Sequence, residues 1–338
     1  MTHRTLLFCI ILPAVVLLSG CIREEEADNT PAGNFEALWN IIDRQYCFLD
    51  YKEQNGCPSW SEVYTAYRPR VHDGMTQAQL FEVLCDMLAE LKDGHVNLYT
   101  AADVGRYWSW HEDYPANFSD SLHALYLGTD YKIASGLHYR ILDDNIGYIY
   151  YGSFGSAVGE GNLDEVMHYL RLCDGLIVDV RNNTGGTLTY AERLAQRFTN
   201  ERRLAGYIMH KTGPGHNDFS APAPEYIDPS DGIRWQKKTV VLTNRSCFSA
   251  TNTFVRNMKA CPLVTVMGDR TGGGSGMPFS SELPNGWSVR FSACPMFDAD
   301  MQQTEFGIEP DIRVSLTPED MARGKDTMIE AAREFLKQ

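Results

Sequence analysis

The sequence predicts an α/β protein with a smaller helical unit at its N-terminal end. Three segments between residues 34 and 91 carry apolar side chains at helical spacing, whereas from residue 137 short β-branched runs alternate with helical patterns. Strands that alternate with helices are typical of a mostly parallel, twisted sheet covered by helices. At 338 residues the chain exceeds one typical domain, so two structural units are expected.

The first residues have the pattern of an export signal. A short basic start precedes the apolar run 6–18, which is too short to cross a membrane and ends in small residues. The ending Leu18-Ser-Gly-Cys21 resembles a bacterial lipobox, which implies a signal peptide over residues 1–20 and a lipid on Cys21. An ordinary signal peptide or a buried apolar segment is the alternative.

Residues 21–33 follow as an acidic, polar segment that contains Pro31 and Gly33, so we expect a flexible lipidated tether. The chain is then expected to be an exported lipoprotein of the outer membrane, on the periplasmic side or the cell surface. Its only membrane contact would be the lipid anchor.

Residues 34–100 are predicted to form the N-terminal helical domain. The pattern favours helices over 34–47, over 60–67 and after Thr76, which suits a helix cap. Val96–Thr100 alternates like a strand. Residues 101–136 show no clear period, and we expect a loop-rich connector there.

Residues 137–338 are predicted to form the α/β core. The expected strands are Tyr139–Leu142, Ile146–Tyr151, Gly175–Val180, Leu204–Met209, Thr239–Thr243, Leu263–Met267 and Trp287–Phe291. The first two read as a hairpin, and helices are expected over 163–172, 190–198 and 317–336 and directly after the 239–243 strand. Residues 211–237 contain several prolines and glycines, and a loop of that length is usually a lid or a binding loop.

Composition excludes some partners and ligands. The formal net charge of −14 argues against nucleic acid, because a phosphate backbone needs a basic face. The cysteines and histidines show no metal-ligand spacing, so neither a metal nor another cofactor is expected. Cys47 and Cys57 flank a short polar loop and could form a disulfide in an oxidising compartment.

The segment Asn244–Phe254 is the centre of the chemical argument. It joins a buried strand to a helical pattern, so Ser246 to Ser249 lie on a strand-to-helix turn. A serine there is commonly a helix cap, because its oxygen accepts from free N–H groups. It can equally be a nucleophile, since the helix start stabilises an oxyanion. This segment alone leaves both interpretations open.

Three other segments offer the missing parts of a site. Gly175–Gly186 runs from a buried strand into adjacent glycines, which can present N–H groups to an oxyanion or a phosphate, although an ordinary turn is the simpler interpretation. Asp93-Gly94-His95 holds a histidine that is either structural or a general base. Gly268–Gly276 is glycine-rich but lacks the lysine of a phosphate-binding loop.

Together these motifs resemble one family of serine peptidases, the C-terminal processing peptidases and the tricorn protease core. The matching segments are Leu91–Val96, Leu176–Gly186, Val240–Phe254, Val266–Gly272 and Gly307–Asp311, in the family's order. The resemblance implies a crotonase-like (ClpP/crotonase) twisted sheet core, an N-terminal helical domain and hydrolysis of peptide bonds in a peptide or protein substrate. Many relatives insert a PDZ domain before the core, but residues 97–136 are too few for one.

The resemblance places the nucleophile at Ser249. It implies an oxyanion hole made by Gly186 and Ala250, with Gly185 as the alternative to Gly186. The processing peptidases use a lysine base at the position of Gly274, and this chain has no lysine between Lys259 and Lys325.

The tricorn-like branch uses a histidine instead, which falls on His95. A glutamate relay orients that histidine, and Glu305 is the first candidate for it, ahead of Glu309. Asn252 stands where the family often has glutamate.

The first hypothesis is therefore a serine-type endopeptidase that acts on exported proteins or peptides. A non-catalytic ligand- or peptide-binding module on the same fold is the alternative, which Asn252 and the missing lysine keep open. A crotonase-type acyl-CoA enzyme shares the core, but coenzyme A is a cytoplasmic cofactor and the export signal counts against it.

Overall fold

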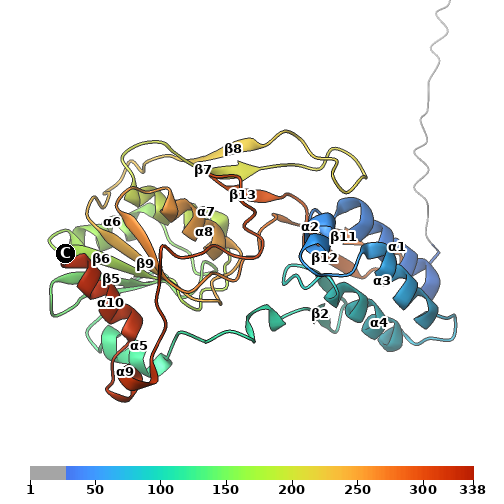
Figure 1. Ribbon diagram of the computed structural model, residues 1–338, viewed down its shortest axis with the longest axis horizontal. Coiled ribbons are helices and arrows are strands. Elements are labelled where there is room, and N and C mark those ends of the chain that lie inside the picture. The colour runs from blue at the N-terminus through green and yellow to red at the C-terminus, as the bar shows by residue number, and fades with distance from the viewer. Residues whose placement is uncertain (1–27) are drawn as a thin grey trace, which may run out of the picture.

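The computed structural model describes residues 28–338, which form two lobes joined by several chain crossings (Figure 1). The predicted signal peptide and Cys21 lie outside the described residues. Among residues 28–338, no helix is long and apolar enough to cross a membrane.

The N-terminal lobe packs helices on one face of a small antiparallel sheet, whose strand order is β11-β12-β1-β2. Its helices are α1 (Pro31–Gln45), α2 (Leu49–Gln54), α3 (Trp60–Tyr67) and α4 (Gln77–Ala89), and its strands are β1 (Asn97–Tyr99), β2 (Val104–Arg106), β11 (Pro278–Glu282) and β12 (Ser288–Ser292). The apolar faces of the helices meet Leu98, Val289 and Phe291 in one buried cluster. The three predicted helices of this region are thus present, and α2 is an additional one.

The hairpin β11–β12 belongs to this lobe although it follows most of the core in the sequence. Asn97 of β1 pairs with Arg290 of β12, so residues from both ends of the chain share one sheet. The sequence places the strand 287–291 in the core, because its alternation predicts a strand but not the partner of that strand. The physical reason for the difference is burial, since Val289 and Phe291 are fully buried against the N-terminal helices.

The core lobe is built on a seven-stranded sheet of order β14-β10-β9-β6-β5-β4-β3. Strands β5, β6, β9, β10 and β14 run parallel, and β3 and β4 extend the sheet in antiparallel fashion. The strands are β3 (Lys132–Ala134), β4 (Leu137–Ile141), β5 (Ile146–Tyr150), β6 (Gly175–Asp179), β9 (Thr239–Thr243), β10 (Val264–Gly268) and β14 (Ile312–Arg313).

Helices cover both faces of this sheet, as a mostly parallel sheet requires. The helices are α5 (Asp120–Leu127), α6 (Glu160–Leu170), α7 (Leu188–Ala195), α8 (Ala250–Lys259), α9 (Pro318–Ala322) and α10 (Thr327–Leu336). Buried side chains of α6, α7 and α8 pack on one face, and those of α10 and the end of α5 pack on the other. Strands β6 and β9 are buried along their whole length, which explains their continuous apolar sequences.

An arm of three strands reaches from the core towards the N-terminal lobe (Figure 1). It consists of β7 (Arg203–Ile208), β8 (Ala223–Ile227) and β13 (Met296–Asp298) in the order β13-β7-β8. The segment 211–237, which is expected to be irregular, therefore contains a strand. At its tip the His216 ring lies between Asp43 and Asp50, with N–O distances of 3.0 and 2.9 Å.

One helix begins earlier than predicted, and another lies where no helix is predicted. Helix α1 begins at Pro31, within the expected tether, because Thr30 accepts a hydrogen bond from Gly33 N and Pro31 suits a first helical position. Helix α5 lies inside the expected loop-rich connector, where Ser119 caps it by accepting from Leu122 N.

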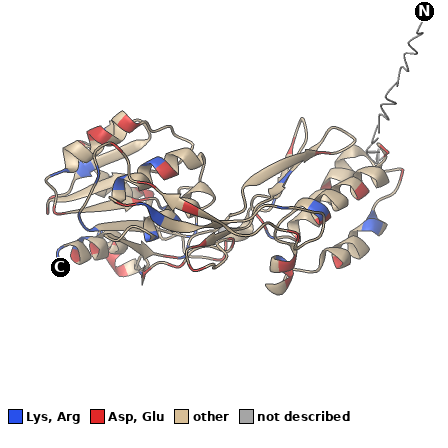
Figure 2. Ribbon diagram, turned by 90° about the horizontal axis from the view of Figure 1, so that it is seen from above, with Lys and Arg blue, Asp and Glu red and all other residues tan. Residues whose placement is uncertain are grey.

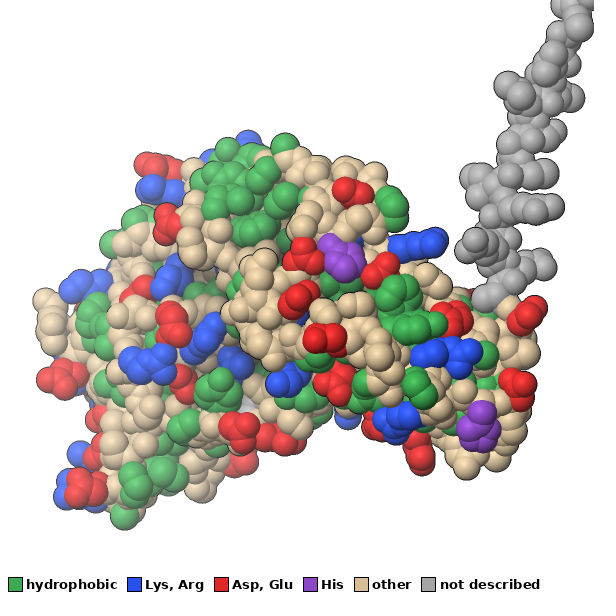
Figure 3. Space-filling view, turned by 45° about the vertical axis from the view of Figure 1, so that its right-hand side comes forward, with side chains coloured by type: hydrophobic (Ala, Val, Ile, Leu, Met, Phe, Trp, Pro, Cys, Tyr) green, Lys and Arg blue, Asp and Glu red, His purple; other side chains and the backbone are tan. Residues whose placement is uncertain are grey.

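Charged residues are scattered along the chain in both lobes (Figure 2). On the face drawn in Figure 3, acidic and basic side chains are interspersed, without a continuous basic area.

Candidate active site

Ser249 sits at the turn between β9 and α8 in a strained backbone conformation, with φ 59° and ψ −122°. It occupies the cap position of α8, yet its side chain makes no capping hydrogen bond. Instead the Ser249 Oγ lies 3.0 Å from His95 Nε2. A non-glycine residue with positive φ is uncommon, and such strain concentrates at functional sites. The geometry therefore favours the nucleophile over the cap.

His95 enters the site from the N-terminal lobe, just before β1. It is 5% exposed, and its ring packs against the Phe248 ring with centroids 4.9 Å apart. Its Nδ1 lies 3.3 Å from the carbonyl oxygen of Ser275, so the neutral ring has its proton on Nδ1 and leaves Nε2 free to accept the Ser249 proton. Burial lowers the pKa of His95 below 6.5, although the Asp93 carboxylate opposes the shift.

Two buried carboxylates hold the histidine segment. Asp93 accepts a hydrogen bond from the His95 backbone N–H at 2.7 Å, and its other oxygen accepts from Tyr46 Oη at 2.7 Å. Glu305 accepts from Ser275 N at 3.0 Å, while the Ser275 carbonyl faces the His95 ring. Glu305 thus lies in the predicted region, but it reaches His95 through Ser275 rather than directly.

Glu305 also forms a buried ion pair with Lys52 of α2. The Lys52 Nζ lies 2.8 Å from Glu305 Oε1, and the two side chains are 2% and 3% exposed. Burial and the charge of the Asp93 carboxylate raise the pKa of Glu305, and the ion pair with Lys52 opposes that rise. Burial lowers the pKa of Lys52, but the Glu305 and Asp93 carboxylates outweigh it and raise the pKa above its ordinary value.

The adjacent glycines lie directly beside the Ser249 turn. A Cβ atom on Gly185 would come within 2.8 Å of Ser249 Cβ and 3.0 Å of Ala250 N. Gly185 N already donates to Asn183 Oδ1 at 3.0 Å. Within residues 28–338 the N–H groups of Gly186 and Ala250 donate to no protein acceptor. The N–H groups of Gly186 and Ala250 are thus free to donate to a ligand, and the absence of a Cβ on Gly185 leaves space beside the Ser249 turn.

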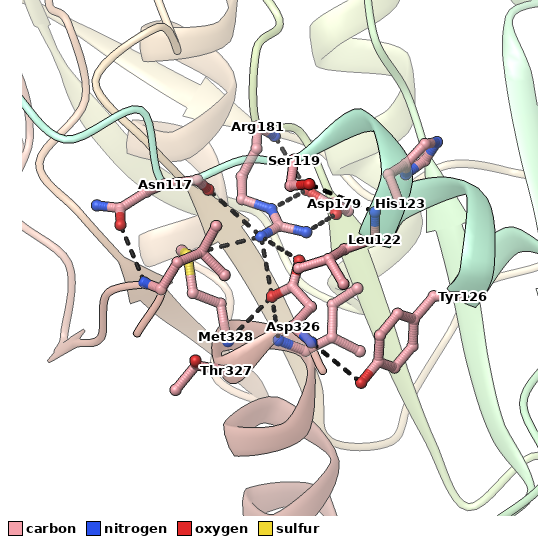
Figure 4. A network of polar contacts seen from close by, with 12 residues as sticks. Asn117, Ser119, Leu122, His123, Tyr126, Asp179, Arg181, Asp326, Thr327 and Met328 are labelled. Atoms are coloured by element: carbon pink, nitrogen blue, oxygen red, sulfur yellow. Dashed lines mark hydrogen bonds and ion pairs between the residues drawn. The ribbon is translucent and has the colours of Figure 1, made fainter. Parts of the chain in front are cut away.

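A buried ionic network fixes the end of β6, the strand that leads to Gly185 and Gly186 (Figure 4). Arg181 donates to Asp179 at 2.7 Å and to Asp326 at 2.9 Å, and all three side chains are fully buried. Asp326 also caps α10 by accepting from Met328 N and Ile329 N. The network ties the C-terminal helix to the residues just before Gly185, so the turn has a rigid base.

The structure explains both departures from the family motifs. Gly274 has φ 71°, and a Cβ there would lie 2.2 Å from the Phe248 ring, so the site has no room for a lysine at this position. Asn252 donates to Thr304 O at 2.9 Å and accepts from Thr271 Oγ1 at 2.6 Å. The Asn252 amide thereby connects α8 to the residue before Glu305. A glutamate carboxylate at this position could not donate the hydrogen bond to the Thr304 carbonyl.

Other candidate residues do not enter the site. Cys247 is fully buried, and burial raises its pKa to about 12, so its thiol is an unreactive packing group. Glu309 pairs with Arg313 at the surface. Cys47 and Cys57 are both free thiols, not a disulfide. Among the described residues no group of His, Cys, Asp and Glu is arranged to hold a metal ion.

This geometry, a serine at a strained turn beside a buried histidine and free amides, defines the class of serine hydrolases. Residues 145–314 match the model of peptidase family S41, and residues 27–89 match the tricorn protease C1 domain. The chain therefore belongs to peptidase family S41, the S41 serine peptidases. The predicted family, fold class and enzyme class are confirmed.

The chain is similar to a structure from Parabacteroides merdae ATCC 43184 that is assigned as a peptidase, with 56% identity, a TM-score of 0.86, and coverage of 91% of this chain and 97% of that one. It also resembles mature CPAF complexed with lactacystin, with a TM-score of 0.67 and coverage of 91% and 97%, but at 12% identity this concerns the fold alone. A tricorn-like protease C-terminal subunit of Sulfurisphaera tokodaii is 30% identical over 169 residues, which is 49% of this chain and 18% of that relative. The chain thus spans only a small part of that relative's length.

Sequence reasoning missed Lys52, Tyr46 and Ser275. Lys52 and Tyr46 lie on or next to N-terminal helices, where a lysine usually faces solvent and a tyrosine reads as core. Ser275 acts through its backbone, which leaves no side-chain pattern to find. The sequence did offer a signal for Asp93, because in the motif Asp93-Gly94-His95 the carboxylate is close enough to accept a hydrogen bond from the His95 backbone.

Proposed function

We propose that the protein is a serine endopeptidase in which Ser249 is the nucleophile and His95 the general base. The proposal rests above all on the 3.0 Å contact between Ser249 Oγ and His95 Nε2. In the first step Oγ attacks the peptide carbonyl, and its proton passes to Nε2. The oxyanion then accepts from the N–H groups of Gly186 and Ala250, each worth roughly 3 kcal/mol in the transition state.

The imidazolium of His95 then returns the proton and completes acylation. Its Nε2–H protonates the leaving amine, the C–N bond breaks, and the acyl group stays on Ser249 as an ester. His95 then takes a proton from water as the water oxygen attacks the ester carbonyl. The bond between the acyl carbon and Ser249 Oγ breaks, His95 Nε2–H returns its proton to Oγ, and the peptide acid is released. Asp93 and Glu305 act as positioning residues, because neither reaches the reacting atoms.

A serine-directed fluorophosphonate probe tests this proposal without knowledge of the substrate. We expect it to label Ser249, and we expect Ser249→Ala and His95→Ala each to remove nearly all labelling and peptide hydrolysis. The double variant should be little worse than either single variant, because residues that act as a unit are strongly non-additive. Ser246→Ala and Cys247→Ser are the controls and should keep most activity.

Absence of labelling in the folded wild-type protein would instead favour the peptide- or ligand-binding module. That alternative draws its support from Asn252 and from the missing lysine. Binding of a labelled peptide library without cleavage would then identify its ligands.

We also propose that the enzyme is exported and lipid-anchored at Cys21, in the outer membrane, so that its substrates are exported proteins or peptides. The motivation is the lipobox-like ending Leu18–Cys21. Cys21→Ser should abolish incorporation of labelled fatty acid and release the protein from membranes. Unchanged fractionation with membranes in that variant would refute the anchor.

A further inference from the structure

The N-terminal lobe places a buried lysine at the back of the site. Lys52 is 1% exposed and lies on α2, 253 positions before its partner Glu305 in the sequence. Its Nζ donates to Glu305 Oε1 at 2.8 Å and to the Lys92 carbonyl at 3.3 Å. The ammonium also lies 4.6 Å from the centre of the Phe306 ring. Three contacts therefore fix the position of this cation.

A lysine is rarely buried without a reason, because desolvation of the ammonium disfavours its charged form. Among the described residues Lys52 is the only cation that pairs with Glu305. Glu305 has the Asp93 carboxylate nearby, and that charge disfavours an ionised Glu305. Among the described residues, Lys52 is therefore the one cation that compensates the charge of the Glu305 carboxylate.

Glu305 is one link of a short chain of contacts that ends at the catalytic base. Its second oxygen accepts from Ser275 N at 3.0 Å, and the carbonyl of the same residue lies 3.3 Å from His95 Nδ1. The Ser275 carbonyl also accepts from Ser292 Oγ at 3.0 Å. The orientation of the His95 ring thus depends on the position of Ser275, and Glu305 holds one side of that residue.

From these contacts we propose that Lys52 is a positioning residue for catalysis, which acts on His95 through Glu305 and Ser275. The inference rests on the proposed function of Ser249 and His95. It assigns to the N-terminal lobe a part in catalysis beyond carrying His95. In this arrangement the lobe keeps the imidazole aligned with Ser249 by holding the glutamate in place.

The competing explanation is that Lys52 only fastens the two lobes together. The two explanations differ in their dependence on Glu305. If Lys52 acts through Glu305, it has little further effect on turnover once Glu305 has lost its carboxylate. If it is a simple fastener, its removal lowers stability and turnover in both backgrounds.

The test compares Lys52→Ala, Glu305→Gln and the double variant in single-turnover fluorophosphonate labelling and in peptide hydrolysis. Misplacement of a catalytic group by about 1 Å costs on the order of 10²-fold in rate, so we expect Lys52→Ala to lower kcat about 10²-fold with little change in KM. In the Glu305→Gln background the same substitution should change kcat less than about threefold. Lys337→Ala is the control, because it removes a lysine from another ion pair, that with Asp144 at 2.8 Å, and Lys337 makes none of the contacts described above.

A cavity of about 200 Å³ permits a second test, because Lys52 and Glu305 both line it. Ethylammonium added to Lys52→Ala should enter this cavity, pair with Glu305 and raise kcat at least tenfold in a saturable manner. Ethanol, which has a similar size and no charge, should not. A purely structural role predicts no recovery with either compound. If Lys52→Ala does not fold, Lys52→Met, which keeps most of the apolar stem and removes the charge, takes its place in the comparison with Glu305→Gln.

Equal losses of kcat from Lys52 substitution with and without Glu305 would overturn the inference, as would wild-type turnover in folded Lys52→Ala. These results differ from a failure of the proposed function. In that case the wild-type protein itself would not label at Ser249, and no Lys52 variant would need to be measured.

Discussion

Substitution of Gly185 by alanine should disable the site while leaving the fold in place. Gly185 has φ 102°, and a Cβ there would lie 2.7 Å from Phe248 O, 2.8 Å from Ser249 Cβ and 3.0 Å from Ala250 N. Each neighbour belongs to the turn that carries the nucleophile. The new methyl group must push this turn away, and it moves the Ala250 amide from its place in the oxyanion hole.

Two magnitudes follow from this geometry. A side chain at such a backbone conformation costs about 1–3 kcal/mol of stability. Loss of one oxyanion donor costs about 10²–10³-fold in kcat. The expected result for Gly185→Ala is therefore a modest fall in Tm together with a loss of kcat, and of the labelling rate of Ser249, by at least about 10²-fold.

Gly286→Ala is the matched control. Gly286 lies in the turn between β11 and β12 and has φ 81°. A Cβ atom at this position would meet no atom of the described residues within 4 Å. The Gly286→Ala variant should lose stability to a similar extent and keep its kcat. Labelling of Gly185→Ala within a few-fold of wild type, at a temperature where it is folded, would refute the placement of the oxyanion hole.

Three further predictions follow from the charged groups. Because burial lowers the pKa of His95 from its ordinary value of 6.5, the acid limb of kcat/KM should lie below pH 6.5; a limb above pH 7 would contradict this. Arg181→Met leaves its two flanking carboxylates buried without a cation, so we expect a loss of about 3–5 kcal/mol in the free energy of unfolding, measured by urea denaturation. Burial lowers the pKa of His216, but hydrogen bonds to Asp43 and Asp50 outweigh burial and raise the pKa. The contact of the arm, through His216, with the N-terminal lobe should therefore be strongest below pH 6.5 and should weaken as the pH rises through the raised pKa. Hydrogen exchange of the arm should show this dependence, and His216→Gln should remove it.

Much of the architecture is visible in the sequence because burial imposes a period on it. Strands β6 and β9 are continuous apolar runs because both of their faces are covered, and α1 and α4 show one apolar face because they pack on one side of a sheet. The strand-to-helix turn that carries Ser246 to Ser249 could be predicted because it is a local feature, but only the family resemblance singled out Ser249. His95 could be predicted from the family motif that contains it.

The remaining features depend on contacts between distant residues, which no local pattern reveals. The alternation of β12 predicts a strand, but only burial of Phe291 against the N-terminal helices decides the sheet that it joins. Lys52 looks like an ordinary helical lysine until its distance from Glu305 is known. Ser275 contributes only its backbone, so its side chain carries no signal of its place beside His95.

The order of the site residues along the chain has a consequence for synthesis. His95 and Lys52 come from the first third of the chain, Ser249 and Glu305 from the last third, and Asp326 locks the turn from the C-terminal helix. A ribosome must therefore complete almost the whole polypeptide before the parts can meet. A fragment limited to residues 145–314 would contain Ser249 and Glu305 but lack both His95 and Lys52. A growing chain thus contains the proposed base long before the proposed nucleophile is synthesised, and the fragment 145–314 contains the nucleophile without the base, so neither holds the complete site.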